Sequence, residues 1–196
     1  MAKQLCFEEV TISNLNAALS VQKQIFPNED ATQNFMDAIY GIDHESEKDK
    51  PYYIPNCQPH YHWIVKHDSN PVGIVGLYSY LPYPGEAWLG WFGILPRYRG
   101  NGFARQAFEF WLDMSRKSGA KTARIYTSES DNAEAIRFYQ KMGMEMEKYY
   151  NPDDVHEFMD SAVIFSKSLT DGPAQPWNNK YLFLGKQEVK QKMTQS

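Results

Sequence analysis

The sequence has few cysteines and no long apolar run. Cys6 and Cys57 are the only cysteines among 196 residues, which excludes a disulfide framework and favours a reducing compartment. The first residues lack the apolar segment of a signal peptide, and no stretch reaches the length of a transmembrane helix. We therefore expect a cytoplasmic protein with no membrane partner.

The sequence also lacks an excess of basic residues. Its formal net charge is -4, whereas a nucleic-acid-binding protein usually presents a basic face. His60, His62 and His67 lie close together in sequence, but no acidic residue or cysteine stands near them at the spacing of a metal site. We therefore expect neither a nucleic-acid partner nor a bound metal.

The composition is that of a globular protein. Hydrophobic residues make up 42% and charged residues 22% of the chain, which are ordinary values for a folded domain. The length suits one domain, and we assign residues 1–170 to it. Residues 171–196 begin with a Pro- and Gly-containing stretch, so we expect a C-terminal extension that packs on the domain or is partly disordered.

Residue patterning predicts alternating strands and helices. The sequence predicts a helix over 13–26 that Ser13 or Asn14 can cap, and a long loop over 43–59 because that stretch is charged and then rich in Pro and Tyr. Another helix is expected over 31–41, followed later by helices over 103–118 and 132–142. Strands are expected over 4–10, 61–67, 72–80, 86–95, 122–128, 145–150 and 161–169.

A glycine-containing loop joins the apolar strand 86–95 to the helix 103–118. Gly100 and Gly102 allow the backbone to pass close to a ligand, and the first N–H groups of the helix form an anion site suited to a pyrophosphate. The loop is neither a P-loop nor a complete G-x-G-x-x-G motif, because Gln106 stands where a third small residue is needed. By itself, such a loop is also compatible with a plain strand-to-helix turn.

The loop Arg99-Gly100-Asn101-Gly102-Phe103-Ala104 resembles the Q/R-x-x-G-x-G/A signature of the GNAT superfamily of N-acetyltransferases. The resemblance implies that the loop amides hold the pyrophosphate of acetyl-CoA and that the preceding strand hydrogen-bonds the pantetheine arm. The implied pantetheine partners are Phe92, Gly93 and Ile94. The implied pyrophosphate partners are Arg99, Gly100, Asn101, Gly102, Phe103, Ala104 and Arg105.

A second segment, from Asn132 to Met144, resembles the family pattern N-x-x-A-x-x-F/L-Y-x-x-x-G-F and departs from it only at Met144. Asn132 and Tyr139 lie about two helical turns apart and therefore on one helix face. The resemblance implies that Asn132 contacts the coenzyme and that Tyr139 protonates the departing thiolate. Taken alone, Tyr139 is better explained as a buried structural aromatic, but the two signatures together, in the family's order, favour the acid role.

The general base is harder to assign. Glu86 starts the strand that the resemblance places beside the thioester, but it precedes the family's usual glutamate position, which corresponds to Trp88. At the other usual position, near the end of strand 122–128, Thr127 cannot act as a base at neutral pH, while Glu129 can. We name Glu86 as the candidate, although a solvated strand-end carboxylate is compatible with the same pattern.

The resemblance implies a fold of the α/β (α+β) class: a mixed, mostly antiparallel sheet of about seven strands with a splayed parallel pair, flanked by about four helices. It implies acetyl transfer from acetyl-CoA to an amine of a small molecule or peptide, in a monomer or homodimer. The alternative is a non-catalytic acyl-CoA sensor or scaffold. The aromatic residues Tyr78, Tyr80, Tyr83, Trp88 and Trp91 can line the acceptor side, where they suit a cation, or belong to the core.

Overall fold

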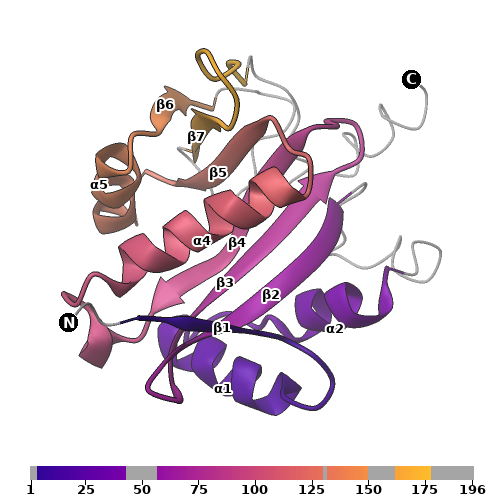
Figure 1. Ribbon diagram of the computed structural model, residues 1–196, viewed down its shortest axis with the longest axis vertical. Helices are drawn as coiled ribbons and strands as arrows, with labels where there is room; N and C mark the ends of the chain where they lie inside the picture. The colour runs from indigo at the N-terminus through magenta and orange to yellow at the C-terminus, as the bar shows by residue number, and fades with distance from the viewer. Residues whose placement is uncertain (1–3, 43–56, 130–131, 150–161, 178–196) are drawn as a thin grey trace.

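The computed structural model describes residues 4–42, 57–129, 132–149 and 162–177. These ranges contain seven strands and four α-helices in one α/β domain (Figure 1). In chain order the elements are β1 (Cys6–Glu9), α1 (Leu15–Ile25), α2 (Thr32–Tyr40), β2 (Cys57–His67), β3 (Asn70–Tyr80), β4 (Glu86–Ile94), the short 3-10 helix η1 (Pro96–Tyr98), α4 (Phe103–Lys117), β5 (Thr122–Ser128), α5 (Ala133–Lys141), β6 (Glu145–Lys148) and β7 (Ala162–Ser168). No helix in these ranges is long and apolar enough to cross a membrane.

All seven strands belong to one sheet with the order β1-β2-β3-β4-β5-β7-β6. Every neighbouring pair is antiparallel except β4 and β5, which are parallel. The chain reaches β5 from β4 through α4, because parallel neighbours need a crossover connection. The mixed, mostly antiparallel sheet that the sequence predicts is therefore confirmed.

The helices cover the two faces of this sheet. Side chains of α4 and α5 join the main core cluster with one face of β2 to β5 and β7, and Figure 1 shows α4 running along the near face, in front of β4. Side chains of α1 and α2 form a separate cluster on the opposite face, over β2 and β3. Each helix presents its apolar stripe to the sheet and its polar side to solvent. We call these the α4 face and the α1 face.

The parallel pair β4 and β5 is joined only over a short distance. Their register runs from Glu86 opposite Thr122 to Trp88 opposite Arg124, and the described residues show no pairing between these two strands beyond that point. The strands therefore diverge toward their carboxyl ends, as expected from the family resemblance. Among the described residues, no strand pairs with the β5 side of the β4 backbone beyond Trp88.

One expected loop is shorter than its sequence suggests. Residues 43–56 lie outside the described residues, but Cys57, Gln58 and Pro59 belong to β2 rather than to a loop. The strand tolerates Pro59 because its register with β3 shifts between Pro59 and Tyr61, and a β-bulge is a place where a missing N–H costs little. Local composition indicates a loop here, but pairing with β3 overrides it.

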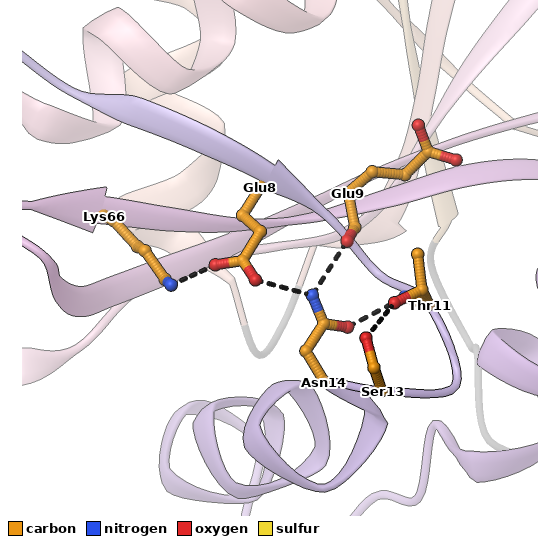
Figure 2. Close-up of polar contacts among 6 residues, drawn as sticks. All are labelled: Glu8, Glu9, Thr11, Ser13, Asn14 and Lys66. Atoms are coloured by element: carbon orange, nitrogen blue, oxygen red, sulfur yellow. Dashed lines mark hydrogen bonds and ion pairs between the residues drawn. The ribbon is translucent and has the colours of Figure 1, made fainter.

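Asn14 joins the edge strand β1 to the start of α1 (Figure 2). Its amide donates hydrogen bonds to the Glu8 carboxylate at 2.9 Å and to the Glu9 carbonyl at 2.9 Å. Its side-chain oxygen accepts the N–H of Thr11 at 2.8 Å. Asn14 occupies the N-cap position without capping the helix N–H groups, so its side chain serves the strand-to-helix turn instead. Glu8 also forms an ion pair with Lys66 of β2.

Replacing Asn14 with alanine should destabilise the protein by about 1–2 kcal/mol, because three hydrogen bonds in a partly exposed turn are lost. Thermal unfolding of Asn14→Ala measures the effect as a lower Tm. The matched control is Ser13→Ala, which removes only the exposed hydroxyl contact with Thr11 and should leave Tm nearly unchanged. Equal melting temperatures for both variants would contradict this role of Asn14.

Candidate active site

A β-bulge in β4 shapes the strand at the point where it leaves β5. Ile74 of β3 pairs with Gly93 and Gly76 pairs with Gly90, so Trp91 and Phe92 together oppose a single residue. Trp91 has a positive φ of 45°, which marks the bulge. As a result, Phe92 packs on the α4 face and Trp91 on the α1 face. The bulge thus reverses the inward and outward alternation between Trp88 and Ile94.

The loop from Arg99 to Gly102 leads into α4 with an open approach to the helix N-terminus. Gly100 and Gly102 adopt positive φ angles of 77° and 76°, and a β-carbon added at either would meet no atom within 4 Å. Gln106 is the first residue of α4 whose N–H bonds back, to the Gly102 carbonyl at 3.3 Å. The N–H groups of the first helical turn are therefore available to an anion.

The loop arginines differ in their present contacts. Arg99 donates to the Ile94 carbonyl at 3.2 Å and lies 4.0 Å from the Glu134 carboxylate, so it spans from the end of β4 to α5. Arg105 pairs with Glu109 one helical turn later, at 2.8 Å, and both side chains are exposed. An exposed pair of this kind is worth little. Arg105 can therefore exchange its partner for a phosphate at low cost.

Tyr139 lies on α5 within the main core cluster. Its ring centroid is 5.3 Å from that of Phe165 and 6.4 Å from that of Phe92. The structure therefore brings the predicted acid next to the predicted pantetheine strand. Burial raises the pKa of Tyr139 well above the usual value for a phenol, because the charged form is poorly solvated there. The hydroxyl keeps its proton at neutral pH.

Asn132 is at the N-cap position of α5 and is exposed. Its carbonyl accepts the Ile136 N–H at 2.9 Å, while its side chain does not cap the helix. The Asn132 amide is therefore placed at the start of the helix that carries Tyr139, with its side chain not engaged by the helix end.

Taken together, these residues fit a coenzyme A thioester. The open glycine loop and the first turn of α4 suit its pyrophosphate, and Tyr139 lies beside β4. The part of β4 that no longer pairs with β5 suits its pantetheine amides. The model of the acetyltransferase (GNAT) family matches residues 29–144. The chain belongs to this family.

A sequence relative and several solved structures agree with this assignment. An uncharacterized N-acetyltransferase of Bacillus subtilis strain 168, YdgE, is 29% identical over 147 residues, which cover 71% of this chain and 90% of the relative. The Escherichia coli ribosomal-protein-S18-alanine N-acetyltransferase matches with a TM-score of 0.57 at 16% identity, over 91% of this chain and all of that one. Arabidopsis thaliana Naa50 in complex with the bisubstrate analogue CoA-Ac-MVNAL matches with a TM-score of 0.58 at 20% identity, over 84% of this chain and 98% of that one.

A coenzyme-bound structure also has this fold. The PaiA N-acetyltransferase of Thermoplasma acidophilum, solved in complex with coenzyme A, matches with a TM-score of 0.56 and 13% identity over 84% of this chain and 99% of that one. At these identities the structural matches establish the fold. With the family assignment, the protein is a GNAT-type N-acetyltransferase, and GNAT enzymes use acetyl-CoA.

Within this GNAT domain, Glu86 has a charged partner. Its carboxylate lies 2.9 Å from the guanidinium of Arg124, whose side chain is fully buried, while 9% of the Glu86 side chain is exposed. Arg124 also donates to the Ser166 hydroxyl. Glu86 lies where β4 and β5 are still paired, about 20 Å along the strand from Phe92 at roughly 3.3 Å per residue. This position weighs against Glu86 as the base, although the role stays a prediction.

The structure adds residues of the GNAT domain that the motifs do not identify. Arg124 and Tyr126 lie on the α1 face of β5. Tyr126 packs against a second core cluster that contains Trp88 and Tyr80, and the Arg124 guanidinium lies against the Trp177 ring of that cluster. Trp177, from the C-terminal segment, is fully buried in the same cluster and lies 4.9 Å from Trp88 between ring centroids. A tryptophan isolated in the polar stretch after 170 is the only sequence signal for this contact.

The other acidic and histidine side chains considered as site residues make structural contacts. Glu129 pairs with Lys148 at 3.2 Å near the sheet edge. His62 is buried and packs against Phe35, and burial lowers its pKa to about 3, so it stays neutral. His60 hydrogen-bonds the Ser79 hydroxyl at 2.7 Å. No group of three metal-ligating side chains occurs in the parts of the chain that the structure describes.

Proposed function

We propose that this GNAT enzyme transfers the acetyl group of acetyl-CoA to an amine of a small molecule or peptide by direct attack in a ternary complex. One observation carries the proposal: β4 and β5 separate beyond Trp88 and Arg124, with the α4 N-terminus and Tyr139 beside the separated part of β4. Acetyl-CoA, when bound, supplies an activated acetyl thioester. The chain's own residues bind and orient acetyl-CoA and transfer the protons that the reaction requires.

Different segments of the site bind different parts of acetyl-CoA. Backbone N–H groups of Gly100 to Arg105 hold the pyrophosphate, aided by the exposed side chains of Arg99 and Arg105. Backbone groups of Phe92, Gly93 and Ile94 hold the pantetheine amides. An N–H group near the bulge, at Phe92 or Gly93, stabilises the oxyanion of the carbonyl under attack in this proposal.

Tyr139 supplies a proton, or a strong hydrogen bond, to the leaving sulfur. Its raised pKa keeps the phenol neutral at assay pH, which is the state a donor requires. The acceptor amine must arrive unprotonated, although a free primary amine titrates near 10.4. A water chain, or the half-buried Glu129 in exchange for its pair with Lys148, can remove that proton.

Turnover of acetyl-CoA with a panel of amines tests this function. Release of free thiol should depend on the amine and should saturate with both substrates, without a burst in the absence of amine. The panel should contain monoamines, polyamines, amino acids and peptides. A burst of thiol release with no amine present would instead indicate an acetyl-enzyme intermediate and contradict direct attack.

Replacing Glu86 with glutamine separates a structural from a catalytic role. We expect a stability loss of about 3 kcal/mol, because the buried Arg124 loses its counter-charge, and a fall of less than tenfold in kcat. Melting curves and initial rates on the same sample measure both quantities. The control is Glu109→Gln, whose exposed pair with Arg105 should be worth at most ~0.5 kcal/mol. A normal Tm with kcat lowered by roughly 10²–10⁴-fold would instead identify Glu86 as the base.

A further inference from the structure

The α1 face of the sheet carries an aromatic cluster at the point where β4 and β5 separate. The last pair of the two strands joins Trp88 to Arg124, and both side chains lie on this face with the second core cluster. Side chains alternate along a strand. Tyr126 is therefore the first side chain of β5 on this face beyond the separation.

An acceptor that meets a thioester in the opening has to come from this face. This step rests on the proposed function, which places the coenzyme along β4 with its pyrophosphate at the start of α4. On the α4 face, Phe92 is stacked with Phe138 at 5.7 Å and packs against Phe108 at 6.2 Å. These rings fill the space beside the thioester, so the α1 face is the side left for the amine.

Tyr78 flanks the opening from the β3 side. A β-carbon added at Gly90 of β4 would lie 3.3 Å from the Tyr78 ring, so the ring lies over the bare backbone of Gly90. Tyr126 stands on the other side, on β5. Both tyrosines are half-buried, and the ring of Trp88 lies between them at 6.1 Å from Tyr78 and 6.4 Å from Tyr126.

The closed end of this space is filled. Trp177 packs edge to face on Trp88 at 4.9 Å and on Tyr83 at 5.0 Å, and the Arg124 guanidinium lies 5.6 Å from the Trp177 ring. Trp88, Trp177 and Arg124 are fully buried. The buried end leaves the half-buried rings of Tyr78 and Tyr126, toward the carboxyl ends of the strands, as the side from which we expect an acceptor to approach.

The two phenols remain neutral. Burial raises the pKa of Tyr126 to about 12, with nearby Cys57 and Glu29 adding to the effect, and burial also raises the pKa of Tyr78 well above its usual value. A neutral phenol cannot serve as the base at physiological pH. Its oxygen can still accept a hydrogen bond from an amine N–H.

We propose that Tyr126 is the acceptor-contacting residue of this enzyme: its hydroxyl accepts an N–H of the incoming amine, while the ring of Tyr78 bounds the amine from the other side. The hydrogen bond turns the nitrogen lone pair toward the opening between β4 and β5. This assignment fits an amine that enters between two aromatic faces, with the ring of Trp177 packed on Trp88 behind it.

The test is Tyr126→Phe, which keeps the ring and removes the hydroxyl. We expect the KM for the amine to rise about 3- to 10-fold, the effect of one lost hydrogen bond, while the acetyl-CoA-induced rise in Tm is unchanged. Tyr61→Phe is the matched control, because Tyr61 is an exposed tyrosine of β2 outside this cluster and its loss should change neither value. Tyr126→Leu, which also removes the ring, should raise the KM further and serves if the first variant is insoluble.

An unchanged KM for the amine in Tyr126→Phe, in a preparation that melts like the wild type, overturns the assignment. The wild type measured in the same experiment separates this result from failure of the proposed function. If the wild type turns over no amine, then the proposed function fails and the assignment of Tyr126 fails with it. If the wild type is active and the Tyr126 variants show the wild-type KM for the amine, the proposed function stands and only the assignment of Tyr126 is wrong.

Discussion

Tyr139→Phe should lower kcat by roughly 10²–10⁴-fold, the usual contribution of a general acid, and leave acetyl-CoA affinity nearly unchanged. The substitution keeps the ring in its packing against Phe92 and Phe165 and removes only the proton donor. Steady-state rates, a melting curve and acetyl-CoA titration on one sample measure all three quantities.

The pH dependence of kcat is a second test of the Tyr139→Phe variant. Because burial raises the pKa of Tyr139, the phenol stays protonated up to and beyond the free value of about 10. Its contribution to stability is therefore fully present below that pH and is lost only above it. When kcat is plotted against pH, ionisation of Tyr139 should cause no fall in the wild-type value below pH ~10. The variant's curve should have the same shape with lower kcat values.

Tyr149→Phe is the control for this experiment. Tyr149 is buried to the same degree as Tyr139, at 8% and 7% exposed, but belongs to the cluster on the α1 face. The kcat of the Tyr149→Phe variant should stay close to the wild-type value. A folded Tyr139→Phe enzyme that runs at the full rate would contradict the acid role, and a few-fold loss would mean that the thiolate leaves without a proton.

Gly102→Leu should abolish the thermal stabilisation by acetyl-CoA. A ligand at 100 times its Kd stabilises a protein by about 2.7 kcal/mol, and a leucine side chain would occupy the open space in front of the α4 N-terminus where the pyrophosphate is expected. The shift in Tm with and without acetyl-CoA measures the effect, with adenosine as a ligand that lacks the pyrophosphate.

The same substitution strains the backbone, and Gly119→Leu controls for that strain. Gly119 follows α4 with a φ of 84° and, like Gly102, has open space around its α-carbon. A leucine at either position costs about 1–2 kcal/mol in the left-handed region. Gly119→Leu should melt lower than the wild type but keep the full acetyl-CoA shift. If both variants keep the shift, the pyrophosphate does not lie at Gly102.

The sequence predicts the parts of this fold that depend on local signals. The strand and helix that flank Gly100 and Gly102 follow from apolar periodicity and glycine placement, and β5 and α5 follow from the pattern around Tyr139. Their order along the chain, together with the family resemblance, is enough to expect β4 and β5 as parallel neighbours. These features are encoded within short windows.

The parts that local signals do not predict arise from contacts between distant strands. The bulge at Trp91 depends on how β3 pairs with β4, and it decides on which face Phe92 lies. The partner of Glu86 is Arg124 on another strand, and Trp177 reaches its place from beyond β7. No periodicity within one segment reports such pairings, so the base assignment made from spacing alone is the weakest part of the predicted site.

Several expectations remain predictions. The division into residues 1–170 and 171–196 is one, although Trp177 shows that the first residues of the extension pack against the domain. The cytoplasmic location and the monomeric or homodimeric state are others.

Transfer of an isotope-labelled acetyl group tests the central claim most directly. The protein is incubated with labelled acetyl-CoA and an amine that stimulates thiol release, and the amine is then analysed by mass spectrometry. We predict that the label appears on the amine nitrogen in equal amount to the thiol released, and that Tyr139→Phe slows both together. Thiol release without a labelled amine, or coenzyme binding with no turnover across the amine panel, would contradict the account.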